Sequence, residues 1–286
     1  MRNLKITRKK LFWLISLILL VGLFLFAFDS RLKTVHYTVK SDKITAPLCI
    51  ALVTDLHSCR YGNDQKQLID AVTARSPDLI LLGGDIFDDE LPHDNARIFL
   101  TAIARQFPCY YVTGNHEFWS GEAPEMVALV RSLGVTALSG DRETLTVNGN
   151  VINLCGIDDQ DAPVYVPGHT SSAEQLRLLA PVFDHNTYTI LLAHRPEQVD
   201  RNDNYLQYPF DLILSGHTHS GQWRVPGMID GLWAPNQGKF PAYTGGLYHF
   251  EHTKLIISRG LARESTRIPR IFNRPELVIV TLAPAT

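Results

Sequence analysis

The sequence has 286 residues, of which 45% are hydrophobic and 20% are charged, and its formal net charge is -2. These values are ordinary for a globular protein, and the lack of a basic excess gives no reason to expect a nucleic-acid partner. With its unusual first stretch of roughly thirty residues set aside, the chain is long enough for one large domain with a full core.

The first unusual feature is an apolar run at residues 11–28, which follows a basic flank at residues 1–10. The run has no charged side chain, and as a helix at about 1.5 Å per residue it is ~27 Å long, close to the roughly 30 Å hydrocarbon core of a bilayer. A core helix would not be apolar on every face beside a basic flank, so we expect a transmembrane anchor. The run is long for a signal peptide and has no small-residue cleavage site, which favours an uncleaved anchor.

Basic residues are distributed unequally around this anchor. Five precede it and two follow it closely: Arg2, Lys5, Arg8, Lys9 and Lys10 before, and Arg31 and Lys33 after. The positive-inside rule therefore predicts a single-pass protein of the cell membrane, with a cytoplasmic N-terminus and an extracytoplasmic body. Residues 29–46 are predicted to form a polar connector, and residues 47–286 the folded domain.

Cysteine spacing excludes two common site types. Cys49, Cys59, Cys109 and Cys155 form no C-x-x-C pair, which argues against a zinc ribbon and a thioredoxin-type motif. An oxidising compartment would permit a disulfide between two of them, whereas small buried thiols on strands are the alternative for Cys49, Cys109 and Cys155.

The body alternates short apolar runs with amphipathic stretches. Five runs rich in Ile, Leu and Val are expected as buried strands, at 48–54, 79–82, 110–113, 189–193 and 212–215. Helical patterns lie between several of them, at 65–75, 94–105 and 124–133. Later strands at 151–156, 254–258 and 277–281 suggest a second sheet. The pattern predicts an α/β body, in which a site lies beyond the carboxyl ends of the strands.

Polar clusters follow directly after these strands. They contain Asp55, His57, Asp85, Asn115, His116, His194, His217 and His219. Residues i and i+2 of an extended chain point the same way, so Asp55 with His57, and His217 with His219, can each direct two side chains into one cavity. Mixed carboxylate, imidazole and amide ligands suit Mn²⁺, Fe²⁺, Zn²⁺ or Co²⁺ better than Ca²⁺.

The clusters together resemble a known family. D-x-H at 55–57, G-D at 84–85, G-N-H-E at 114–117, a lone His194 and G-H-T-H at 216–219 are similar to the five signature blocks of calcineurin-like metallophosphoesterases, in the same order. The resemblance implies a four-layer αββα sandwich with a site for two divalent ions, among which we favour Mn.

The resemblance also assigns roles to individual residues. It places Asp55, His57 and His219 on one metal, Asn115, His194 and His217 on the other, and Asp85 between both. It makes His116 the acid that protonates the leaving oxygen, with Asp88 as its partner. The acidic run that continues through Asp89 and Glu90 is otherwise typical of solvated surface.

Three segments near the C-terminus point to a subgroup. Residues 216–222, 258–261 and 270–277 are similar to the bacterial membrane-associated phosphodiesterase branch, which includes UDP-diacylglucosamine hydrolases. Gln222, Trp223 and Arg259 are candidate substrate contacts, and packing is the alternative for Trp223. The substrate stays open between a lipid-linked or envelope phosphodiester and soluble phosphomonoesters or nucleotides. An inactive metal-binding scaffold would be expected to lack ligands or His116, and none is missing.

Overall fold

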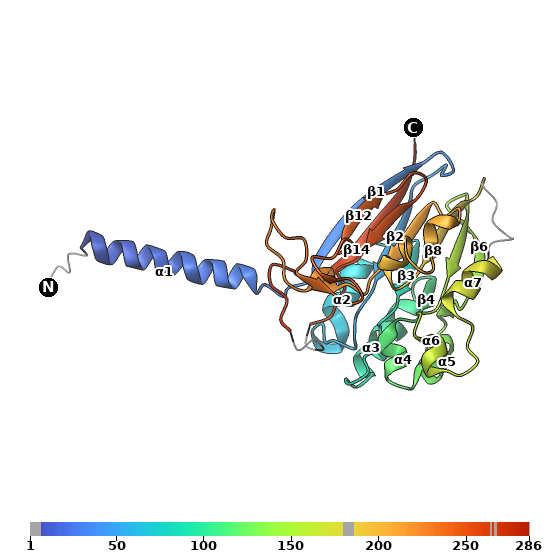
Figure 1. Cartoon of the computed structure of the whole chain (residues 1–286), viewed down its shortest axis with the longest axis horizontal. Helices are drawn as coiled ribbons and strands as arrows, with labels where there is room; N and C mark the ends of the chain where they lie inside the picture. Colours follow the sequence, from blue (N-terminus) through green and yellow to red (C-terminus); the bar gives the residue numbers. More distant parts are fainter. Residues whose placement is uncertain (1–6, 180–185, 264, 266–267, 286) are drawn as a thin grey trace.

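The computed structural model describes residues 7–179, 186–263, 265 and 268–285, which form a folded body and one helix projecting from it (Figure 1). This helix, α1 (Arg8–Ala27), buries only Ala27, and the side-chain oxygen of Thr7 accepts a hydrogen bond from the Lys10 backbone N–H at its start. By length and composition α1 can cross a membrane, as expected for residues 11–28. Arg2 and Lys5 of the basic flank lie outside the described residues.

Two six-stranded sheets form the body. The first has the order β1 (Lys33–Ser41), β14 (Glu276–Pro284), β2 (Leu48–Val53), β3 (Leu79–Gly83), β4 (Cys109–Val112) and β5 (Thr136–Ala137). The second has the order β12 (Gly246–His249), β13 (Lys254–Ile257), β9 (Leu212–Ser215), β8 (Tyr188–Leu192), β7 (Asn150–Gly156) and β6 (Asp141–Val147). A separate ribbon pairs β10 (Trp233–Ala234) with β11 (Gly238–Lys239).

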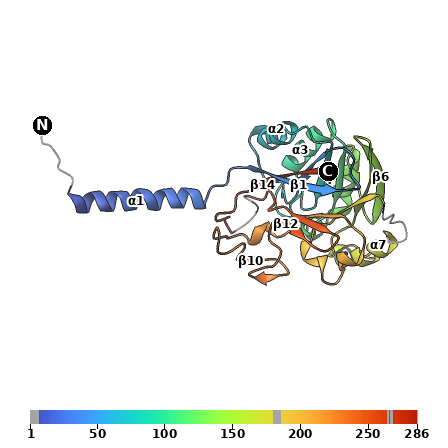
Figure 2. The ribbon, with the colours of Figure 1, turned by 90° about the horizontal axis from the view of Figure 1, so that it is seen from above.

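The sheets and helices stack in four layers, which confirms the expected αββα sandwich. The helices that cover the first sheet are α2 (Lys66–Thr73), α3 (Asp94–Ala104) and α5 (Ala123–Ser132), and the short helix α4 (Asn115–Trp119) packs next to α5. An apolar core that includes Ile50, Leu81 and Ile190 fills the space between the two sheets. On the outer face of the second sheet, α7 (Ser172–Leu179) and short 3-10 turns pack over Leu191 and Ile213. Figure 2 shows α2 and α3 on one side of the sheets and α7 on the other. Helix α6 (Ala162–Tyr165) is a single short turn.

Strand direction explains where the polar clusters meet. Strands β2, β3 and β4 are parallel neighbours, and so are β8 and β9 in the other sheet. Parallel strands bring their carboxyl ends to one edge of a sheet. Each of the five strands is followed there by one of the predicted clusters.

The segment expected as a connector at residues 29–46 is different in the structure. Strand β1 occupies Lys33–Ser41 and pairs in parallel with β14, so the folded body begins well before residue 47. Val39 and Ile44 are buried in the core between the sheets. Sequence reasoning missed this strand because most of its side chains are exposed or half-buried and its partner lies at the other end of the chain.

Local predictions of helices were close. The segments expected at 65–75, 94–105 and 124–133 correspond to α2, α3 and α5, with small differences at the ends. All four cysteines are free thiols, and Cys59, Cys109 and Cys155 are buried. The alternative of buried thiols on strands therefore holds for Cys109 on β4 and Cys155 on β7, whereas Cys49 on β2 is half-buried.

Candidate metal centre

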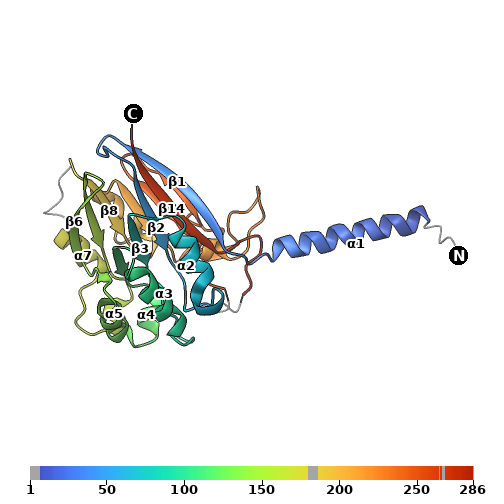
Figure 3. The same ribbon diagram turned by 180° about the vertical axis from the view of Figure 1, so that it is seen from behind.

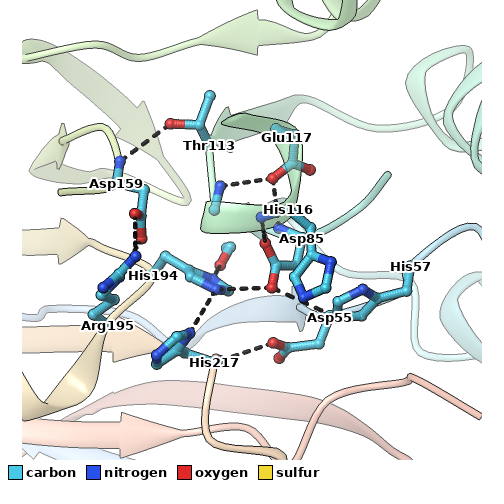
Figure 4. Close-up of polar contacts among 12 residues, drawn as sticks. Asp55, His57, Asp85, Thr113, His116, Glu117, Asp159, His194, Arg195 and His217 are labelled. Carbon is cyan, nitrogen blue, oxygen red and sulfur yellow. Dashed lines mark hydrogen bonds and ion pairs between the residues drawn. The ribbon is translucent and has the colours of Figure 1, made fainter. Parts of the chain in front are cut away.

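Most of the predicted ligand residues lie close together beyond the carboxyl ends of the strands, where Figure 4 shows Asp55, His57, Asp85, His194 and His217. One group of side chains is formed by Asp55, His57 and His219, and another by Asp85, His194 and His217. Within each group, one potential ligand atom per residue lies within 4.8 Å of the others. His57, Asp85 and His116 form a third such group, so Asp85 is shared between neighbours on both sides.

Close packing of the loops makes this convergence possible. A Cβ on Gly114 would collide with Oδ1 of Asp85, and a Cβ on Gly216 would collide with Oδ2 of Asp55. Asp55, Asp85 and His217 themselves have positive φ angles of 51°, 50° and 70°. Such left-handed conformations are uncommon outside glycine and concentrate at functional sites. The backbone is thus bent at the ligands, and glycine is needed where two loops touch.

Hydrogen bonds to one ring nitrogen orient two of the histidines. His194 Nδ1 lies 2.8 Å from the carbonyl oxygen of Gly83, and its Nε2 then faces Asp85 Oδ2 at 3.1 Å. His57 Nδ1 lies 3.0 Å from Asp88 Oδ2, which turns His57 Nε2 toward the cluster. An Nδ1–H that donates to a carbonyl or carboxylate fixes the tautomer whose Nε2 lone pair can bind a metal.

The residues fit a divalent metal centre, because several of their buried side-chain atoms have no hydrogen-bond partner. Asp55 Oδ2, His57 Nε2 and Asn115 Oδ1 are buried and have no hydrogen-bond partner. Most buried polar side-chain atoms do have a partner, so three orphaned atoms in one cluster call for an ion. Carboxylate, imidazole and amide donors together are a ligand set for transition metals.

Electrostatics keep two of the ligands in the form that a metal requires. Burial, followed by the positive charge of His194, holds the pKa of His217 well below its ordinary value. Burial, followed by His57, does the same to the pKa of His219. Metal ions bind neutral imidazole, so these two shifts favour metal binding. Burial also lowers the pKa of His194, but the charge of Asp85 outweighs it and raises this pKa to about 10, so a metal ion has to displace a proton there.

His116 stands at the open side of the cluster, where 23% of its side chain is exposed. Its Nδ1 lies 2.6 Å from Oδ1 of Asp89 but 4.0 Å from the nearer oxygen of Asp88. The expected pairing of His116 with Asp88 is therefore replaced by a pairing with Asp89. Asp88 is turned away because its Oδ1 accepts hydrogen bonds from the backbone N–H groups of Glu90 and Leu91, which leaves Oδ2 on His57.

The three candidate substrate contacts make protein contacts of their own. Gln222 donates a hydrogen bond from Nε2 to the carbonyl oxygen of Ile268 at 2.5 Å, and Arg259 Nε lies 3.5 Å from a carboxylate oxygen of Glu276. Trp223 donates from Nε1 to the carbonyl oxygen of Pro269 at 2.9 Å. Substrate binding by these side chains stays a prediction.

Sequence reasoning missed the role of Glu117. Its buried carboxylate accepts hydrogen bonds from the backbone N–H groups of Asp85, Ile86, Phe87 and Gly114, at 2.7 to 3.1 Å. Burial, followed by the charge of Asp85, raises the pKa of Glu117 to about 7, and the backbone donors oppose that rise. The side chain ties the loop after β3 to the start of α4. Its place in the G-N-H-E block was the only signal.

Further residues hold the histidines from outside the cluster. Asn273 donates a hydrogen bond from Nδ2 to the carbonyl oxygen of His219 at 2.7 Å, and Arg270 Nη2 lies 3.3 Å from His219 Nδ1. Asn236 Nδ2 lies 3.3 Å from His217 Nε2. Next to His194, Arg195 forms a buried ion pair with Asp159 at 2.6 Å. Only the segment at 270–277 had been singled out in the sequence.

We expect Glu117→Gln to weaken metal binding while the chain stays folded. The amide nitrogen cannot accept a hydrogen bond, so part of the backbone support for Asp85 is lost, and loss of such outer support typically lowers metal affinity ~10 to 100-fold. Calorimetric titration with Mn²⁺ measures the effect. Glu122→Gln, at an exposed position three residues from α4, is the matched control. Equal affinities for the two variants would show that Glu117 does not position the ligands.

Comparison with known proteins agrees with this geometry. The family model for calcineurin-like phosphoesterases matches residues 49–221. The chain is 30% identical to an uncharacterised metallophosphoesterase, YkuE, of Bacillus subtilis, over 88% of this chain and 85% of that protein. It is 31% identical to the phosphodiesterase YaeI of Escherichia coli, over 83% of each chain.

A third relative is named as a transmembrane protein. The chain is 30% identical to a transmembrane protein with a metallophosphoesterase domain from Bos taurus, over 83% of this chain and 53% of that protein. The family match covers more than half of the chain and contains the whole ligand cluster. The chain therefore belongs to the calcineurin-like phosphoesterase family and is a metal-dependent phosphoester hydrolase.

Proposed function

We propose that the chain is a phosphodiesterase whose site holds two divalent metal ions with Asp85 between them. One observation carries the proposal: Asp85 Oδ2 lies 3.1 Å from Nε2 of His194 in one group and 3.5 Å from Nε2 of His57 in the other. Asp55, His57 and His219 would hold one ion. Asn115, His194 and His217 would hold the second, and Mn²⁺ is the ion that we favour.

The ions, when bound, supply positive charge for the phosphoryl oxygens and can lower the pKa of a water molecule from 15.7 to about 7. The chain supplies the geometry around them. His116 donates a backbone hydrogen bond to Asp85 Oδ1 at 2.9 Å, which fixes the start of α4 against the cluster. Its imidazole is consequently held beside the place where a substrate phosphate would lie.

His116 is proposed as the general acid. A hydrogen bond from Nδ1–H to Asp89 orients the ring and leaves Nε2 as the nitrogen that carries a proton toward the leaving oxygen. Asp88 would act on the metal ligand His57 instead.

The choice of substrate class rests on separate observations. The name of the relative YaeI supports a phosphodiester over a phosphomonoester or nucleotide, which is the alternative. The apolar helix α1 supports a substrate linked to a membrane lipid or to the cell envelope, as in the branch of UDP-diacylglucosamine hydrolases. An inactive scaffold is disfavoured because the six His and Asp residues proposed as ligands and His116 all lie in the cluster, and Asn115 directly precedes His116.

Placement in the cell follows from the basic residues around α1. Arg8, Lys9 and Lys10 lie in its first turn. We infer that this end is cytoplasmic and that the body lies outside the cytoplasm, because Lys and Arg accumulate on the cytoplasmic side of membrane helices. An extracytoplasmic body would act on an envelope phosphodiester rather than on a cytoplasmic nucleotide-lipid.

Leaving-group dependence tests the function and the acid together. We expect the purified chain with Mn²⁺ to hydrolyse bis-p-nitrophenyl phosphate and a glycerophosphodiester, and to favour both over p-nitrophenyl phosphate. His116→Asn should slow the glycerophosphodiester ~10² to 10⁴-fold and the p-nitrophenyl diester far less, because a nitrophenolate leaves without a proton. Steady-state rates for each substrate measure this. Preference for p-nitrophenyl phosphate would support the phosphomonoesterase alternative.

The neighbouring carboxylates provide matched variants for the same assay. Asp89→Asn should reproduce the His116→Asn pattern more mildly and leave Mn²⁺ affinity unchanged. Asp88→Asn should lower Mn²⁺ affinity and slow both substrates alike, since its contact is with His57. The reverse assignment of effects would show that Asp88 is the partner of His116, as first expected.

Orientation can be measured with protease on intact spheroplasts. We expect external protease to digest the body and spare the N-terminus, because the basic flank should stay inside. Digestion of the body only after lysis would reverse the orientation and make a cytoplasmic lipid substrate the better proposal.

A further inference from the structure

Exposed apolar side chains gather in one segment next to the metal centre. This segment, residues 222–245, is called here the rim loop, and it contains the ribbon of β10 and β11. Its large exposed apolar residues are Trp223, Val225, Met228, Trp233 and Phe240, with exposed fractions of 40%, 40%, 83%, 52% and 65%. Single exposed apolar side chains are ordinary, whereas a group of them marks an interaction surface.

The rim loop is built as one unit. Trp233 pairs with Lys239 across the ribbon, and the Phe240 N–H donates a hydrogen bond to the carbonyl oxygen of Leu232 at 2.9 Å. Arg224 and Asp230 form an ion pair at 2.9 Å, which cancels two charges within the loop. A surface with paired charges and exposed aromatic and Met side chains is suited to transfer from water into a less polar environment.

The rim loop is fixed to the metal centre and begins close to His219. Asn236 Nδ2 contacts both His217 Nε2 at 3.3 Å and Glu197 Oε1 at 3.1 Å. His219, three residues before Gln222, has 13% of its side chain exposed, whereas the side chains of His194 and Asp55 are fully buried. The rim loop thus adjoins the part of the site where His219 is exposed.

Helix α1 ends at the same place. The Phe272 N–H donates a hydrogen bond to the carbonyl oxygen of Ala27 at 2.7 Å, and the rings of Phe26 and Phe272 lie 5.7 Å apart. The next residue, Asn273, holds the carbonyl oxygen of His219. Figures 1, 2 and 3 all show the rim loop on the side of the body that faces α1.

We propose that the rim loop is a second membrane contact, in which Met228, Trp233 and Phe240 enter the interfacial layer of the bilayer that α1 spans. Trp and Phe are favoured at this depth, and an exposed lysine such as Lys239 can extend its amine to the headgroups. The contact turns the mouth of the site toward the lipid surface. This inference rests on the proposed function in one respect: it makes the substrate a phosphoester carried by a membrane lipid.

The experiment uses the full chain in vesicles of phosphatidylcholine that contain phosphatidylcholine spin-labelled near the headgroup. A fluorescent label is placed on Met228→Cys or on Phe240→Cys. Leu178→Cys is the matched control, because Leu178 is 64% exposed on α7 and Figure 1 shows α7 on the side of the body away from α1. The melting temperature of each labelled variant confirms that the fold is retained. We expect spin-labelled lipid to quench the labels at 228 and 240 several-fold more strongly than the label at 178.

Equal quenching at the three positions would overturn the inference. The inference would also be overturned if spin-labelled lipid did not quench the fluorescence of the labels at 228 and 240, and if this fluorescence changed instead with protein concentration in detergent. That result would indicate that a second copy of the chain covers this surface. The same labelled chains are assayed on bis-p-nitrophenyl phosphate with Mn²⁺. Hydrolysis without quenching leaves the proposed function standing and removes the membrane contact. Quenching without hydrolysis supports the membrane contact and contradicts the proposed function.

Discussion

The buried carboxylate of Asp85 is the constraint on which the site depends. A buried charge costs several kcal/mol unless it is paired, and Asp85 lies between the imidazoles of His194 and His57. Its backbone is held from two directions, because Glu117 accepts its N–H and the N–H of His57 donates to its carbonyl oxygen. Gly114 has to lack a side chain for Asp85 to fit. The carboxylate of Asp85, which follows β3, thus lies against the loops that follow β2, β4 and β8.

The C-terminal part of the chain connects this centre to the N-terminal helix. After β13, the chain returns past the cluster, where Arg270 and Asn273 contact His219. Phe272, between them in sequence, contacts the end of α1. The chain then forms β14, which pairs with β1. Strand β1 is the edge strand of the first sheet and directly follows α1 in sequence. Two adjacent residues, Phe272 and Asn273, thus contact the end of α1 and the proposed ligand His219.

The sequence predicted the buried strands and identified the residues that gather at the candidate metal centre, because both have local signatures, a short apolar run followed by glycine and a metal-binding side chain. It did not predict β1, whose partner β14 is distant in sequence. It could not distinguish Asp88 from Asp89, because a turn that depends on the N–H groups of Glu90 and Leu91 decides which carboxylate faces His116. The role of Glu117 was hidden because its partners are backbone groups, which leave no trace in a sequence.

Metal content is the most direct test of the shared carboxylate. Elemental analysis of the purified chain after equilibration with Mn²⁺ should give two ions per chain, the number expected for a two-metal phosphoesterase site. Asp85→Ala should retain almost none, because both groups lose a ligand, whereas Asp55→Ala should keep the ion held by His194 and His217. An Asp85→Ala chain that binds as much metal as the Asp55→Ala chain, or a wild-type chain that binds a single ion, would contradict a centre built around Asp85.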